Sequence, residues 1–144
     1  MRCQATILRQ LLLEGRLDQT CLALLAGEAR EATMAVFAKE REDPVESSRQ
    51  FGNNCHLPGS YQGALQAFLH HRDGSDQQQQ YRDTVRAVVR GGGCNCSRAN
   101  YAGALLGAAR GPAVIPQDWL GRINQAETIL HTILTAADIA VKKN

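Results

Sequence analysis

The sequence has few aromatic residues and no long apolar run. Phenylalanine, tryptophan and tyrosine make up 5% of its 144 residues. A membrane helix needs about 20 consecutive apolar residues, and the stretch Gly103–Ala109 is too short and too rich in glycine. The segment Met1–Leu13 is interrupted by Arg9 and Gln10 and lacks the small-residue cleavage site of a signal peptide. We therefore expect a soluble protein with no membrane partner.

The sequence also lacks a strong excess of charge and a dense set of cysteines. Sixteen basic and fourteen acidic residues are interspersed and give a formal net charge of +2. Such a balance supplies no basic field for nucleic acid or an anionic membrane. An odd number of cysteines without a disulfide framework indicates free thiols in a reducing, cytoplasmic setting. The five are Cys3, Cys21, Cys55, Cys94 and Cys96.

Helical periodicity recurs along the whole chain, whereas no run of alternating β-branched and polar residues proposes a strand. The sequence therefore predicts an all-α fold, and its length suits a single domain over residues 1–144. We expect one helix over 28–42 that closes before Pro44, and another capped by Ser60. An early helix should place Ile7, Leu11 and Leu12 on its apolar face.

A glycine-rich segment carries the most informative pattern of the sequence. It runs from Gly91 through Gly92 and Gly93 to Cys94-Asn95-Cys96-Ser97, and a helical stretch follows it. Consecutive glycines permit positive φ angles and a close approach of the backbone. Ser97 is the residue type that caps a helix N-terminus. We therefore expect a tight loop that leads directly into a central helix.

Gly92–Gly107, together with Ile115-Pro116-Gln117-Asp118-Trp119-Leu120, resembles the C-terminal motif of the ADP-ribosylglycohydrolase family. In that family a Gly-Gly-Asp-Thr-Asp-Thr loop precedes a helix of the type Ala-Gly-Ala-Leu-x-Gly-Ala and then Ile-Pro-x-x-Trp-Leu. With the register fixed at Gly103, the two aspartate positions fall on Cys94 and Cys96, and the second threonine position falls on Ser97. The resemblance implies an orthogonal multi-helix bundle.

The wording of the loop is more similar to one branch of this family, the J-type lens crystallins and selenoprotein J. There the loop reads Gly-Gly-x-Asn-Cys-Ser-Arg, and the variable position is a selenocysteine in selenoprotein J. Cys94 resembles the sulfur counterpart of that residue. The clear resemblance covers residues 51–138. The first fifty residues match only in helical character, and we expect the N-terminal half of the family fold to be absent from this chain.

The resemblance implies a site for two magnesium ions at Cys94, Cys96 and Ser97, within the loop of Gly92, Gly93 and Asn95. Magnesium prefers oxygen ligands, whereas thiolates favour softer metals. We therefore expect no magnesium, no other cofactor and no ADP-ribose-type ligand. The leading interpretation is a non-catalytic protein with a structural or interaction role, which self-associates through an apolar face left exposed.

Three other interpretations of the cysteine loop stay open. Cys94 and Cys96 stand before a helix N-terminus, near Arg90 and Arg98, and both features favour a reactive thiolate for a redox protein of the selenoprotein J type. Zinc would require Cys55 and His56 to join the two loop cysteines. Residual hydrolysis of an ADP-ribosyl bond is the third.

Overall fold

The computed structural model describes residues 2–142, and within them the side chains of residues 3–135. It is built from helices, and the described residues contain no β-strand, which confirms the all-α prediction. Internal contacts group the chain into two compact units, Met1–Val114 and Ile115–Asn144. The single-domain assignment over residues 1–144 stays a prediction. Among the described helices, none is long and apolar enough to span a membrane.

The first unit contains six α-helices and two short 3-10 segments within its described residues, and the second unit contains two α-helices. Those of the first unit are α1 (Arg2–Glu14), η1 (Gln19–Leu24), α2 (Gly27–Ala38), α3 (Pro44–Phe51), α4 (Gly59–His71), α5 (Gln77–Arg90), α6 (Asn95–Arg110) and η2 (Pro112–Val114). Those of the second unit are α7 (Gln117–Leu120) and α8 (Ala126–Lys142).

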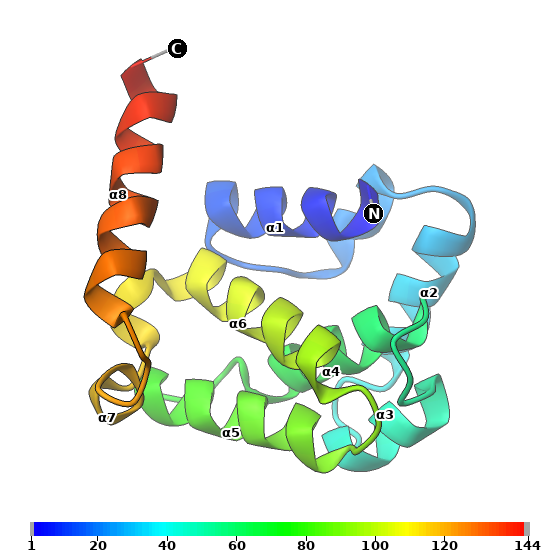
Figure 1. Ribbon diagram of the computed structural model, residues 1–144. Coiled ribbons are helices and arrows are strands. Elements are labelled where there is room, and N and C mark those ends of the chain that lie inside the picture. The colour runs from blue at the N-terminus through cyan, green and yellow to red at the C-terminus, as the bar shows by residue number, and fades with distance from the viewer. Residues whose placement is uncertain (1, 143–144) are drawn as a thin grey trace. The chain divides into compact units, whose positions relative to one another are not determined.

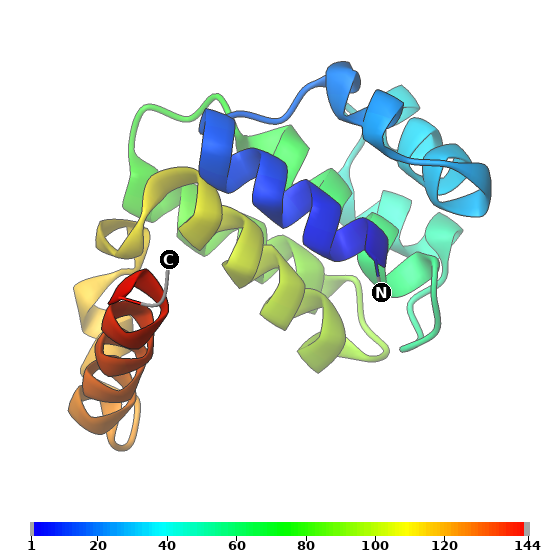
Figure 2. The same ribbon diagram turned by 90° about the horizontal axis from the view of Figure 1, so that it is seen from above.

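Helix α4 is the centre of the first unit. Every residue from Gly59 to Leu69 is buried, and α4 contacts α2, α3, α5 and α6. Helix α1 lies along α6, as the two views in Figures 1 and 2 show. Its side chains Ile7 and Leu11 are fully buried, whereas Leu12 is 69% exposed and does not belong to the apolar face predicted for it. Burying such aliphatic side chains contributes about 1.5–3 kcal/mol each.

Helix α3 is not among the helices expected from the sequence, in which Pro44 marks only the end of the preceding helix. The structure ends α2 at Ala38 and begins α3 at Pro44 itself. Proline suits the first turn of a helix, where its missing N–H costs little. The Asp43 carboxylate accepts a hydrogen bond from the Glu46 backbone N–H at 2.9 Å and caps the new helix.

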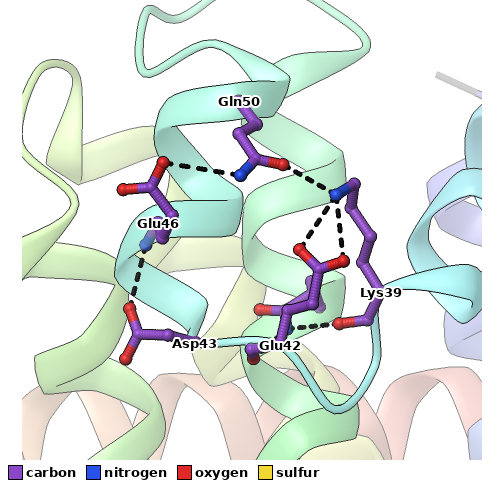
Figure 3. A network of polar contacts seen from close by, with 6 residues as sticks. Lys39, Glu42, Asp43, Glu46 and Gln50 are labelled. Atoms are coloured by element: carbon purple, nitrogen blue, oxygen red, sulfur yellow. Dashed lines mark hydrogen bonds and ion pairs between the residues drawn. The ribbon is translucent and has the colours of Figure 1, made fainter.

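A network of hydrogen bonds and one ion pair fixes the turn between α2 and α3 (Figure 3). The Lys39 ammonium donates to both Glu42 carboxylate oxygens, at 3.1 and 2.9 Å, and to Gln50 Oε1 at 2.7 Å. From α4, the buried Gln66 side chain donates to the backbone carbonyls of Lys39 and Glu42, both at 2.9 Å. The turn is therefore held from the solvent side and from the core.

Neither serine predicted as an N-cap has that role. Helix α4 begins at Gly59, one residue before Ser60, with Pro58 at the cap. A Cβ on Gly59 would lie 2.5 Å from the Phe51 carbonyl oxygen, so only glycine fits this crossing. Helix α6 begins at Asn95 with Cys94 at the cap, which places Ser97 inside the first turn.

Arg98 is the largest fully buried side chain of the described residues, and it binds together the segments around the glycine loop. Its guanidinium donates to Val88 O at 3.4 and 3.3 Å, to Asn53 O at 2.9 Å, to Asn95 Oδ1 at 3.1 Å and to Gly92 O. These acceptors belong to the end of α5, the loop before α4, the glycine loop and α6. Because the charge is buried, its donors require partners of this kind.

The glycine loop packs directly on the loop that follows α3. Gly93 has φ +62°, and a Cβ there would overlap the carbonyl group of Asn53. Gly92 has φ +74°, but its nearest neighbour beyond the adjacent residues is Asn53 Nδ2, at 3.8 Å from an added Cβ. The backbone N–H of Cys94 then donates to Asn53 O at 2.7 Å. Positive φ is therefore required at both glycines, and close approach only at Gly93.

We predict that Arg98→Met lowers the free energy of unfolding by at least about 3 kcal/mol, because several buried carbonyl oxygens lose their donors together. Arg90→Met, on the exposed end of α5, is the matched control and should change it by less than about 0.5 kcal/mol. Urea denaturation of both variants measures the difference. Equal stabilities would contradict the central role given to Arg98.

We also predict that Gly93→Ala destabilises the fold more than Gly92→Ala. Both changes place alanine at positive φ, at a cost of about 1–3 kcal/mol, but only the first adds a clash with the Asn53 backbone. The same denaturation experiment tests this order. A Gly92→Ala variant as unstable as Gly93→Ala would show that the close contact with Asn53 does not matter.

Candidate functional site

The candidate site is the loop that connects α5 to α6. Helix α5 ends at Arg90 with Gly91 at its C-cap, and α6 starts at Asn95. Cys94 is the N-cap residue of α6. The backbone N–H of Asn95 donates to Gly93 O at 3.0 Å, which closes the turn. The structure thus places Gly92, Gly93, Cys94, Asn95, Cys96 and Ser97 in one loop and first helical turn.

Two thiols and one hydroxyl meet at the start of α6. Cys94 Sγ lies 3.6 Å from Cys96 Sγ and 3.4 Å from Ser97 Oγ. Cys94 is half-buried and Cys96 is exposed, and both are free thiols. The two sulfur atoms are therefore in van der Waals contact at the surface, with a hydroxyl beside one of them.

Hydrogen bonds lower the pKa of the Cys94 thiol. The Ser97 hydroxyl lowers the pKa of Cys94 most, followed by the Ser97 backbone N–H and the thiols of Cys96 and Cys55. These donors stabilise the thiolate, as does the N-terminus of α6. Burial has the opposite effect on Cys21, whose pKa it raises to about 11. The pKa values of these two thiols are therefore shifted in opposite directions.

Cys55 is the third thiol of this region, contributed by the loop that precedes α4. Its side chain is exposed, and it is two residues from Asn53, the residue on which the glycine loop packs. Cys55, Ser60, Ser97 and Tyr101 are among the residues that line a surface hollow of about 470 Å³. Tyr101 is 8% exposed and belongs to the core.

The oxygen atoms of the loop are largely committed to other contacts. Asn95 Oδ1 accepts a hydrogen bond from Arg98, and the Ser97 hydroxyl contacts Cys94. Residues 91–98 include neither aspartate nor glutamate. A buried guanidinium directly below the loop adds positive charge. This set of donors does not fit a hard divalent cation, which takes carboxylate, carbonyl and water oxygens.

The zinc interpretation is not supported by the arrangement of the side chains. Within residues 3–135, no three histidine, cysteine, aspartate or glutamate side chains come together as a group that could hold a metal ion. His56 therefore does not complete a site with Cys55, Cys94 and Cys96. The roles assigned to the loop residues from the sequence stay predictions.

Sequence reasoning considered Arg98 only as a charge near the thiols and did not single out Asn53. The structure turns the Arg98 guanidinium inward onto carbonyl groups, and Ser97, not arginine, is the main influence on Cys94. The Ser-Arg pair that closes the loop motif was the available signal for Arg98. No sequence signal pointed to Asn53, because the atom that makes its contacts is the backbone carbonyl oxygen, which every residue has.

Comparison with known proteins gives two curated relatives, both crystallins from Tripedalia cystophora. Crystallin J1A is 37% identical over 83 residues, which cover 58% of this chain and 24% of the crystallin. Crystallin J1B is 33% identical over 87 residues, which cover 60% of this chain and 25% of the crystallin. The chain thus matches about a quarter of the length of these relatives. No solved structure matches it significantly.

A sequence profile of the ADP-ribosylglycohydrolase family matches residues 2–143, including the first fifty residues, where the sequence alone suggested only helical character. The match spans nearly the whole chain, and the crystallin J relatives agree with the branch indicated by the loop. The resemblance inferred from the glycine-cysteine loop is thereby confirmed, and this chain belongs to the ADP-ribosylglycohydrolase family.

Proposed function

We propose that this chain is a non-catalytic member of its family that has lost the magnesium site and has a structural or interaction role, like a crystallin. The observation that carries the proposal is the composition of the loop at the start of α6. Sulfur stands at residues 94 and 96, where the family's aspartates would supply oxygen, and the loop contains no carboxylate. A thiol neither carries the charge nor offers the hard donor that magnesium requires.

The surroundings of the loop support the same proposal. Arg98 donates to Gly92 O and Asn95 Oδ1, and so occupies loop oxygens that a cation would otherwise attract. Its buried positive charge also opposes a second cation nearby, since charge interactions strengthen in a medium of low dielectric constant. The curated relatives are named as crystallins, which supports a structural role. Five free thiols suit a cytoplasmic location.

We predict that titration of ADP-ribose into the chain gives no saturable heat in isothermal calorimetry, with or without magnesium. The physical reason is the absence of carboxylate ligands in the loop. A catalytically active member of the family, titrated under the same conditions, is the positive control. Saturable ADP-ribose binding that depends on magnesium would contradict the proposal and favour residual hydrolysis.

We further propose that the chain self-associates through apolar side chains left at its surface. On α1, Leu12 and Leu13 are 69% and 65% exposed. On α8, Ile133 and Leu134 are 57% and 67% exposed, and Ile129 and Leu130 next to them are 47% and 39% exposed. Contiguous exposed apolar residues of this kind are typical of protein interfaces. A second copy of the chain offers the same surfaces.

We expect light scattering to give a mass above the 15.7 kDa of one chain, rising with protein concentration. Replacing both Ile133 and Leu134 by glutamine should shift the mass toward the single chain. Replacing the neighbouring exposed Thr132 by glutamine is the matched control and should not. A stable single chain at all concentrations would refute self-association.

A further inference from the structure

The three thiols around the glycine loop have no part in a structural role, and their geometry suggests a chemistry of their own. Cys94 and Cys96 are in contact at 3.6 Å between their sulfur atoms, at the molecular surface. Cys55 is also exposed and lies close enough to Cys94 to influence its acidity. The other two cysteines are different, because Cys21 is buried and Cys3 is partly buried beside Thr33.

The backbone at Cys94 permits a covalent bond between the two neighbouring sulfur atoms. A disulfide has an S–S distance of about 2.0 Å, so the sulfurs must approach by roughly 1.6 Å from their contact distance. Cys94 is the cap residue, outside the regular helix, and Cys96 lies in the first turn, whose N–H groups have no partner within the helix. Rotation of the two side chains and a small adjustment of this turn bring the sulfurs together without unfolding α6.

The rest of the loop would stay in place during that adjustment. The Cys94 backbone N–H is held by Asn53 O, and the Arg98 guanidinium is anchored on Gly92 O and Asn53 O. Thiol–disulfide exchange runs in both directions through a mixed disulfide. The couple would therefore be reversible, unlike a disulfide that stabilises a fold.

We propose that Cys94 and Cys96 form a reversible dithiol–disulfide couple whose substrates are low-molecular-weight disulfides. The Cys94 thiolate attacks one sulfur of the small disulfide, an S–S bond forms between them, and the other half leaves as a thiolate that takes up a proton. Cys96 then loses its proton and attacks the Cys94 sulfur, which releases the second small thiol. In total, two protein thiols are oxidised by two electrons and one small disulfide is reduced to two thiols.

The surroundings assign the attacking role to Cys94. Ser97 Oγ and Cys96 Sγ both contact its sulfur and stabilise the negative charge that attack requires. Cys96 Sγ lies 3.6 Å from Cys94 Sγ, and Cys96 is the resolving residue. Cys55 belongs to a separate loop and forms no bond in this reaction. The inference goes beyond the proposed structural role and does not rest on it. A chain that binds no magnesium can lack this thiol chemistry, and a chain with this thiol chemistry can still bind magnesium.

The positions of the arginines allow the disulfide partners to be identified after digestion with trypsin. Trypsin cleaves after Arg90 and Arg98, so Cys94 and Cys96 share the peptide of residues 91–98. Cleavage after Arg49 and Arg72 places Cys55 in another peptide, and Cys3 and Cys21 fall in two more. A disulfide within the 91–98 peptide appears as the loss of two hydrogens without any cross-link. A disulfide with Cys55 appears as two linked peptides.

The experiment treats the reduced full-length chain with glutathione disulfide, quenches with acid, alkylates the remaining thiols and maps the peptides by mass spectrometry. We expect the 91–98 peptide to lose two hydrogens at least about ten times faster than Cys21 becomes modified, and dithiothreitol to reverse the change. Cys96→Ser should trap glutathione on Cys94. Cys94→Ser should reduce modification of the peptide at least about tenfold, and Cys55→Ser should still give the loss of two hydrogens within the 91–98 peptide.

Two results would overturn the proposal. One is a cross-link between the 91–98 and Cys55 peptides as the main product, which would make Cys55 the partner of Cys94. The other is modification of Cys94 and Cys96 no faster than in a synthetic peptide of residues 91–98. Circular dichroism of each serine variant verifies that the helices are retained. The magnesium titration is a separate measurement, so failure here leaves the proposed function standing.

Discussion

The structure around the candidate site depends on one buried guanidinium group, that of Arg98. Arg98 extends from the first turn of α6 into the core and donates to carbonyl oxygens of α5, the glycine loop and the loop before α4. A guanidinium excluded from water requires all of these acceptors, and the acceptors require it. The loop before α4, which is distant in the sequence, therefore keeps a fixed geometry against the end of α5 and the glycine loop, next to the thiols.

The chemistry of the loop follows from this arrangement. Because Arg98 uses the oxygens of Gly92 and Asn95, the thiols of Cys94 and Cys96 and the Ser97 hydroxyl are the groups left beside one another at the start of α6. Two of them end in sulfur, and the third stabilises a sulfur anion. The structural proposal and the redox proposal are two consequences of one composition.

The sequence predicted the helical class, the central loop and the family, because these depend on local periodicity and on a contiguous motif. It failed where the outcome depends on tertiary contacts. Pro44 both ends one helix and begins another, and the Asp43 cap that decides the second was not considered. Ser60 and Ser97 have the right residue type for caps, but the crossing of Gly59 over Phe51 and the packing of Gly93 on Asn53 set the helix starts elsewhere. Arg98 was visible as a charge, whereas its burial was not.

The close contact of Gly93 with Asn53 has a consequence for how such a loop diverges. The backbone of Gly93 lies against the backbone carbonyl of Asn53, and the Cys94 backbone N–H donates to the same carbonyl. These contacts do not involve the side chains of residues 94 and 96. Side chains at those two positions can be exchanged between oxygen and sulfur chemistry with little effect on the scaffold that presents them. Catalytic identity can drift in such a loop while its architecture is inherited unchanged.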